Sequence, residues 1–172
     1  GGIVAVGARW NDGSGTDAGH VRVYQNIGDS WVQLGQDIDG ENNDDFSGHA
    51  LAINGEGDRV AIGAFGNDDN GANSGHVRVY EYNGSTWIQL GQDIDGELAN
   101  DFKGFQVDIN QIGDKIVVGS YGNDDNGINS GKTQVYYFDG NSWIQFGSNI
   151  YGANPNDASG KSVKISGFSN II

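Results

Sequence analysis

The sequence predicts an all-β protein built from three copies of one four-stranded unit. Its 172 residues include 30 glycines and one proline, with many Asn and Asp residues, a composition typical of short strands joined by tight turns. The copies keep a constant period of 56 residues, which three sets of positions show: Gly7, Gly63 and Gly119; Trp31, Trp87 and Trp143; Asp45, Asp101 and Asp157. A fixed period indicates a repeat architecture in which neighbouring units bury one another's apolar faces.

In the middle copy we predict four short strands, at residues 48–53, 59–64, 76–82 and 86–94. Each segment is enriched in β-branched and aromatic residues and is bounded by Gly, Asn and Asp. The second strand is apolar or small on both faces, which indicates that it is covered on both sides. The third alternates between valines and larger polar or aromatic residues, so its two faces differ.

Short connections predict antiparallel pairing of consecutive strands. Asn83-Gly84, and Asp139-Gly140 in the third copy, favour a type I′ turn between the third and fourth strands. Residues 54–58 form a similarly tight connection, whereas residues 65–74 are longer and polar. Each copy is therefore expected to be a four-stranded meander.

Four-stranded antiparallel units at a constant period, covered on both faces, are typical of the blades of a β-propeller. The alternative is a linear β-solenoid, whose repeats are usually shorter and built from parallel strands. The predicted boundaries are 1–44 for the last three strands of a first blade, 45–100 and 101–156 for two complete blades, and 157–172 for the first strand and the start of the second strand of a following blade.

Three blades are too few to close a propeller, which typically has four to eight. Unclosed blade faces would expose apolar surface and unpaired strand edges. We therefore expect the ring to be completed in one of two ways. Either this sequence is a segment of a longer chain, or identical chains complete one ring by homo-oligomerisation.

Three motifs recur at fixed places in the copies. Phe46-Ser47-Gly48 precedes the first strand of the middle copy, Gly63-Ala64-Phe65 ends its second strand, and Trp87-Ile88-Gln89-Leu90-Gly91 follows the third. With these motifs the whole chain resembles FG-GAP repeats, the repeats of integrin α-chain propellers. It is most similar to the secreted bacterial-type branch, in which each blade ends in Trp-x-Gln-Leu-Gly.

The resemblance implies a secreted or cell-surface protein that binds or adheres to its partner, with calcium in the loops. Two features depart from the family pattern. The proline of the second motif is replaced by Arg9, Phe65 and Tyr121. The loop that holds calcium in integrin-like blades is reduced to residues 54–58 and 110–114, which is too short to supply the usual alternating ligands.

Two other loops carry candidate ligands for calcium, which prefers several oxygen ligands from alternate positions of a flexible loop. The first joins one copy to the next and carries Asp37, Asp39, Glu41 and Asp45, which recur as Asp93, Asp95, Glu97 and Asp101. The third copy keeps only Asp157 of this set. A structural role is the alternative, in which the last Asp of each set braces the turn by hydrogen bonds to the backbone.

The second candidate loop joins the second and third strands. Its acidic residues are Asp68 and Asp69, which recur as Asp124 and Asp125. Acid and amide groups followed by Gly are similar to the opening of an EF-hand loop, but the closing Glu is missing. Turn formation by Asn and Asp side chains explains the same pattern.

The tryptophans and histidines do not form a recognisable catalytic or metal-binding pattern. Trp31, Trp87 and Trp143 stand at one phase of the repeat, which predicts packing between blades, whereas Trp10 replaces a glycine of the other copies and is a candidate for contact with a ligand. The histidines form no recurring metal-binding pattern and no Ser/His/Asp arrangement is recognisable, so we expect no catalytic activity.

A formal net charge of −14 argues against nucleic acid and anionic membrane surfaces as partners. No apolar run reaches the length of a membrane span. The sequence thus favours a non-catalytic propeller that binds a protein or glycan ligand with the loops of one rim. The alternative is a structural subunit of a surface appendage, filament or coat.

Overall fold

The computed structural model describes residues 2–167, which form three antiparallel sheets and no helix. Sheet 1 contains β1 (Ile3–Ala8), β2 (His20–Ile27), β3 (Ser30–Gln33) and β4 (Ile38–Asp39). Sheet 2 contains β5 (Ala50–Ile53), β6 (Arg59–Ala64), β7 (His76–Tyr82), β8 (Trp87–Gln89) and β9 (Ile94–Asp95). Sheet 3 contains β10 (Lys103–Ile109), β11 (Lys115–Ser120), β12 (Lys132–Phe138), β13 (Trp143–Gln145) and β14 (Ile150–Tyr151).

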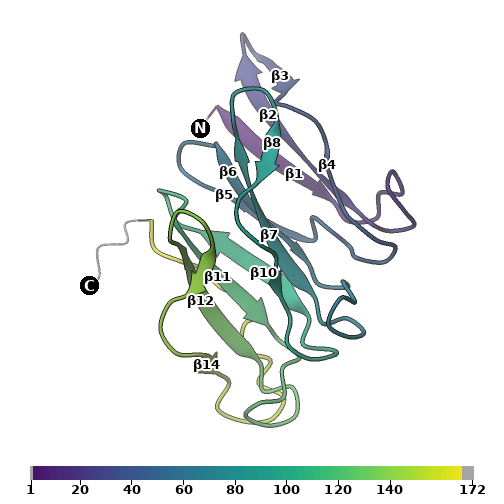
Figure 1. Ribbon diagram of the computed structural model, residues 1–172, viewed down its shortest axis with the longest axis vertical. Coiled ribbons are helices and arrows are strands. Elements are labelled where there is room, and N and C mark those ends of the chain that lie inside the picture. Colours follow the sequence, from purple (N-terminus) through teal and green to yellow (C-terminus); the bar gives the residue numbers. More distant parts are fainter. Residues whose placement is uncertain (1, 168–172) are drawn as a thin grey trace.

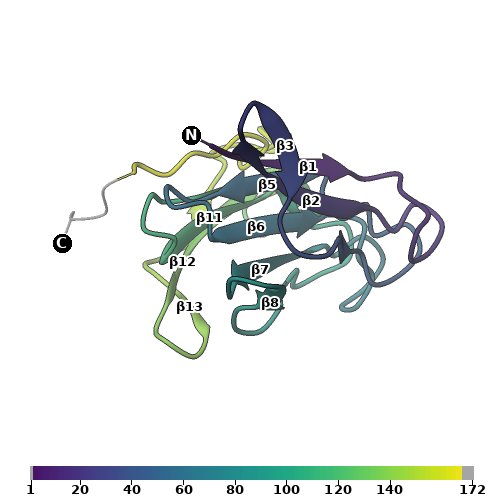
Figure 2. The same cartoon turned by 90° about the horizontal axis from the view of Figure 1, so that it is seen from above.

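The three sheets follow one another along the longest axis of the molecule, from purple through teal to green and yellow (Figure 1). Figure 2 looks down this direction and shows the loops that follow β1 and β6 on the same side of the stack. The strands from β1 to β3, from β5 to β8 and from β10 to β13 each pair antiparallel with the next strand in the chain, which confirms the predicted meander. Within residues 2–167 there is no helix of membrane-spanning length and hydrophobicity.

Two apolar cores hold the stack together, one between each pair of adjacent sheets. Between sheets 1 and 2, Val21 and Val23 of β2 pack with Val60 and Ile62 of β6. Strand β6 is buried along both faces because it lies between two neighbouring sheets, whereas the equivalent β1 of sheet 1 is largely exposed. The two-sided apolar pattern of this strand is therefore explained by stacking.

The repeated tryptophans pack between sheets, as predicted. Trp87 is 3% exposed, and its Nε1 donates a hydrogen bond to the backbone oxygen of Leu34 in the preceding repeat at 2.8 Å. Trp143 makes the same bond to Leu90, also at 2.8 Å. Trp31 is 52% exposed, because no other sheet among residues 2–167 packs against this face of sheet 1.

The fourth strand differs from the prediction. The structure divides the expected strand at 86–94 into β8 and β9, which both pair with the same edge of β7. The chain turns out of the ladder at Gly91, whose φ is 78°. This turn lets the side chain of Gln92 reach Trp143, where it donates to the backbone oxygen at 2.8 Å and accepts from the backbone nitrogen at 3.0 Å.

The predicted type I′ turn at Asn83-Gly84 was wrong. Gly84 has a positive φ of 95°, but Asn83 does not, and its side-chain oxygen accepts hydrogen bonds from the backbone nitrogens of Ser85 and Thr86. The same holds at Asp139-Gly140. Two consecutive positive φ angles occur instead at Gly28-Asp29, in the corresponding hairpin of sheet 1.

The expected strand after residue 157 is not formed among the described residues. Gly131 and Ser159 form an isolated bridge, and residues 161–167 carry no strand. In sheet 2 the equivalent strand β5 is paired with β6, whose counterpart at the end of the chain would begin at residue 171. The predicted start of that second strand lies outside the described residues.

Candidate functional site

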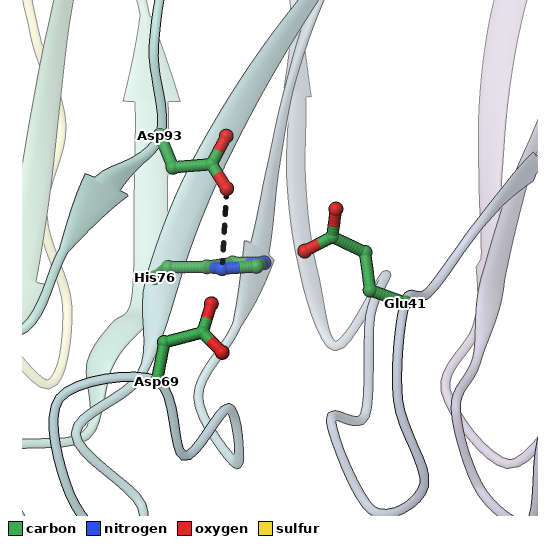
Figure 3. Close-up of side chains that lie close together, drawn as sticks. All are labelled: Glu41, Asp69, His76 and Asp93. Atoms are coloured by element: carbon green, nitrogen blue, oxygen red, sulfur yellow. Dashed lines mark ion pairs between the residues drawn. The ribbon is translucent and has the colours of Figure 1, made fainter.

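Four polar side chains from two neighbouring repeats meet at one end of sheet 2: Glu41, Asp69, His76 and Asp93 (Figure 3). Glu41 lies in the loop after β4, Asp69 in the loop between β6 and β7, His76 at the start of β7 and Asp93 just before β9. One ligand atom of each lies within 4.8 Å of those of the others. The two loop types that the sequence singled out separately thus contribute to one cluster.

Asparagine side chains fix the loop that carries Asp69. The side-chain oxygen of Asn67, which is fully buried, accepts a hydrogen bond from the backbone nitrogen of Asp69 at 3.1 Å. Asn70 donates to the backbone oxygen of Gly96 at 3.0 Å, which ties this loop to the segment after β9. Asn and Asp favour such turns because their side chains bond to nearby backbone groups.

His76 is the most deeply buried member of the cluster. Its side chain is 1% exposed, and neither ring nitrogen has a hydrogen-bond partner among the described residues. The nearest carboxylate, that of Asp93, lies 4.0 Å from Nδ1, which is too long for a hydrogen bond. Burial lowers the pKa of His76 to about 4, and the positive charge of Arg78 adds to this effect, so the ring is neutral at pH 7.

The carboxylates around His76 are only partly neutralised. Arg78 forms an ion pair with Glu41 at 2.9 Å and donates a hydrogen bond to the backbone oxygen of Asp39 at 3.0 Å. Asp93 accepts a hydrogen bond from the neutral amide of Gln89. Burial raises the pKa of Glu41, and the neighbouring carboxylates of Asp93 and Asp69 act in the same direction. The cluster therefore concentrates negative charge beside a neutral imidazole.

Sheet 3 places a lysine where sheet 2 has His76. The Nζ atom of Lys132 lies 3.1 Å from Glu97 and 3.1 Å from Asp125, which are the counterparts of Glu41 and Asp69. The side chain of Lys132 is 1% exposed. Burial alone would lower the pKa of Lys132, but the hydrogen bonds with Glu97 and Asp125 outweigh it and raise the pKa. Asn149 replaces Asp93 in this copy.

Sheet 1 carries a reduced version of the cluster, made of His20, Asp37 and Asp39. Here Arg22 binds Asp37 through two hydrogen bonds of 2.9 and 2.7 Å. The hydrogen bonds from Arg22 and Gln33 lower the pKa of Asp37 to about 2. The charge of Asp37 is therefore matched by a neighbouring guanidinium.

Several predicted ligands accept hydrogen bonds from the backbone of turns. Asp45 is buried and accepts from the backbone nitrogen of Asn42 at 3.0 Å and from Asn67, and Asp101 makes equivalent bonds. Asp68 accepts from the backbone nitrogen of Asn73 at 2.7 Å, and Asp124 repeats this bond. The structural alternative raised for these loops accounts for the contacts of all four residues.

Asp95 stands beside the cluster without joining it. Burial raises the pKa of Asp95, and its Oδ1 is buried with no hydrogen-bond partner among residues 2–167. Sequence reasoning placed Asp95 in a calcium set and passed over His76, since one histidine in a strand gives no metal-binding pattern. One feature of the sequence could have indicated the cluster: the third copy has Lys132 at the position of His76 and Asn149 at the position of Asp93, so the two positions change together.

A second feature lies around Trp10, just after the end of β1. This indole is 64% exposed, and the guanidinium of Arg9 lies over its ring at 4.2 Å from the centroid. Arg9 also donates to Nδ1 of His49 at 2.9 Å. These three residues line a hollow of about 560 Å³ together with Gly7 and Gly48.

No protein-family model matches the sequence, and no curated protein sequence matches it significantly. The likeness to FG-GAP repeats therefore rests on the motifs of the sequence alone.

Proposed function

We propose that this chain is part of a β-propeller of the FG-GAP type, secreted or displayed at the cell surface, and that it binds a ligand without catalysis. The support for a propeller is the stacking of three meander sheets in constant register. Sheet 1 leaves Val4, Val6, Tyr24 and Trp31 around an apolar hollow, and the counterparts of Val4, Val6 and Trp31 in sheet 2 are buried by the neighbouring repeat. Further repeats, from a longer chain or a second copy, would cover this face.

Trp10 is the observation that favours ligand binding. Its counterparts are Gly66 and Gly122, which lie tightly under the loop of the preceding repeat. A Cβ atom at Gly66 would stand 2.1 Å from the backbone oxygen of Asp44, so a tryptophan fits only where such a loop is absent or displaced. An exposed indole with an arginine over one face, beside a hollow, is suited to stacking on a sugar ring or an aromatic side chain.

The proposed ligand is a glycan or a protein segment that contacts Trp10 and Arg9. We would test it by probing a glycan array with the 172-residue chain and with a Trp10→Gly variant. Glycine is the residue of the other two copies, so the variant keeps the repeat pattern and should retain its fold. The proposal predicts glycan binding that falls at least about tenfold in the variant, equivalent to about 1.4 kcal/mol. Unchanged binding would show that Trp10 makes no contact.

The alternative is a structural subunit that polymerises into an appendage or coat. It is favoured by exposed apolar side chains at both ends of the stack. These include Trp31 in sheet 1 and Phe146 and Ile150 in sheet 3. The two ends of the stack have different surfaces, so contact between one end of a chain and the other end of the next chain is head-to-tail. Such contacts generate closed rings or open filaments. Light scattering after size exclusion distinguishes the two functions. A defined monomer or closed ring supports a binding module, whereas filaments that grow with concentration support a structural subunit.

A further inference from the structure

We infer that Glu41, Asp69, His76 and Asp93 form a binding site for a divalent transition-metal ion such as Zn²⁺ or Mn²⁺. Figure 3 shows the imidazole between the carboxylates of Asp93 and Asp69, with Glu41 beyond the edge of the ring. The four potential ligand atoms lie within 4.8 Å of one another. In a tetrahedral site with bonds of about 2.1 Å the ligand atoms are about 3.4 Å apart, so the side chains would rotate toward one another to close the set around one ion.

The state of His76 is the first argument for a ligand. A buried polar group without a partner costs free energy, and such groups are rare in folded proteins. The ring of His76 is 1% exposed, and both of its nitrogens lack a hydrogen-bond partner within the described part of the chain. Neighbouring carboxylates are acceptors only and cannot donate to a neutral ring. A metal ion would satisfy one nitrogen directly.

Charge is the second argument. Three carboxylates and one guanidinium, that of Arg78, stand around the neutral ring, and Arg78 is already bound to Glu41. Two negative charges are left without a compensating group in the cluster. One divalent cation matches this charge.

Sheet 3 supplies the third argument, because it places a cation at the equivalent position. The ammonium of Lys132 contacts Glu97 and Asp125 in a buried position. Where lysine replaces histidine, the position of the third carboxylate, Asp93, is held by the neutral Asn149. Sheet 3 thus has an ammonium and the neutral Gln134, whereas sheet 2 has an imidazole, one more carboxylate and the guanidinium of Arg78.

The donor set favours a transition metal over calcium. Calcium prefers six to eight oxygen ligands, whereas imidazole nitrogen together with carboxylates suits Zn²⁺ and related ions. The site needs only the loop after β4 and sheet 2, and it is independent of how the stack is completed. A negative result for metal binding would therefore leave the proposal of glycan binding at Trp10 untouched, and the reverse also holds.

The experiment is metal titration of the 172-residue chain by calorimetry, with native mass spectrometry for stoichiometry, using Zn²⁺, Mn²⁺ and Ca²⁺ in turn after chelation. We expect one Zn²⁺ or Mn²⁺ per chain, bound more tightly than Ca²⁺. The His76→Lys variant carries the residue of sheet 3, but beside Arg78 where sheet 3 has Gln134, so circular dichroism checks that it keeps its fold. We expect its affinity for Zn²⁺ to fall at least about 100-fold. Asp93→Asn is a second variant, for which weaker binding is also expected.

The matched gain-of-site variant is Lys132→His combined with Asn149→Asp, which gives sheet 3 the donors of sheet 2. We expect it to bind a second Zn²⁺ ion. The inference is overturned if the native chain binds no Zn²⁺ or Mn²⁺ at micromolar concentration, or if folded His76→Lys and Asp93→Asn proteins bind as tightly as the native chain. Calcium binding that is unaffected by His76→Lys would also overturn it, since the imidazole would then be no ligand.

Discussion

Lys103 is a charged residue held almost entirely inside the protein. It is 2% exposed, and its Nζ donates to the backbone oxygen of Asp95 and to the hydroxyl of Tyr136, both at 2.9 Å. Burial lowers the pKa of Lys103 to about 8, because removing an ammonium from water costs more than these contacts return. Burial raises the pKa of Tyr136, and hydrogen bonds raise that of Lys132, so near pH 10 the folded chain keeps protons on these two groups that the unfolded chain loses, which opposes the effect of Lys103 only at the upper end of the range.

This environment predicts a pH-dependent stability. The unfolded chain keeps the ordinary lysine pKa of 10.5, so between about pH 8 and 10.5 it binds more protons at Lys103 than the folded chain does. The free energy of unfolding should therefore rise with pH in this range, by at most about 1.4 kcal/mol per pH unit. Urea unfolding at pH 8, 9 and 10 measures the slope.

Lys103→Met preserves the apolar stem and removes the titrating group. The slope should be lost in this variant and retained in Lys161→Met, which changes an exposed lysine. A slope that survives in Lys103→Met would assign the pH dependence to another group.

At the scale of elements, close approach of neighbouring repeats depends on glycine. The α-carbon of Gly63 in β6 faces the backbone of Gly104 in the next repeat, and a Cβ atom added at Gly63 would stand 2.0 Å from the oxygen of Gly104. Gly7 and Gly119 make the equivalent contacts with the backbone of Gly48 and of Gly160. These glycines therefore recur every 56 residues because each sheet contacts the next one at this position.

Gly63→Ala is expected to lower the free energy of unfolding by about 3 kcal/mol, because backbone must move to admit the methyl group. Gly2→Ala is the matched control, since no heavy atom lies within 4 Å of the added Cβ, and it should change stability by less than about 0.5 kcal/mol. Denaturant titration compares the two. Equal costs would mean that the sheets separate easily at this point.

At the scale of the whole molecule, the ends of the stack differ from its interior. Trp87 and Trp31 occupy the same repeat position, but the first is buried between sheets and the second lies on the open face of sheet 1. Comparing the loss of stability on replacing Trp31 and Trp87 by alanine therefore tests whether another molecule covers the open face of sheet 1.

We expect Trp87→Ala to cost about 3–5 kcal/mol, as for other buried aromatic residues. Trp31→Ala should cost much less when the chain is dilute and alone. If copies associate through this face, the cost of Trp31→Ala should grow with protein concentration. Thermal unfolding over a hundredfold concentration range tests this, and equal costs for both variants at low concentration would contradict the difference in burial.

The sequence by itself determined the repeat, the all-β class, the meander order and the packing role of Trp87 and Trp143, because these depend on periodicity and on local turn chemistry. Tertiary structure decided what depends on contacts between repeats. The fourth strand divides at Gly91, where the side chain of Gln92 bonds to the backbone of Trp143, 51 residues away. His76, Asp69 and Glu41 became one cluster because stacking brings two separate loops against the start of β7. A linear pattern records which residues recur, whereas the burial and charge that make a site arise only when the copies pack together.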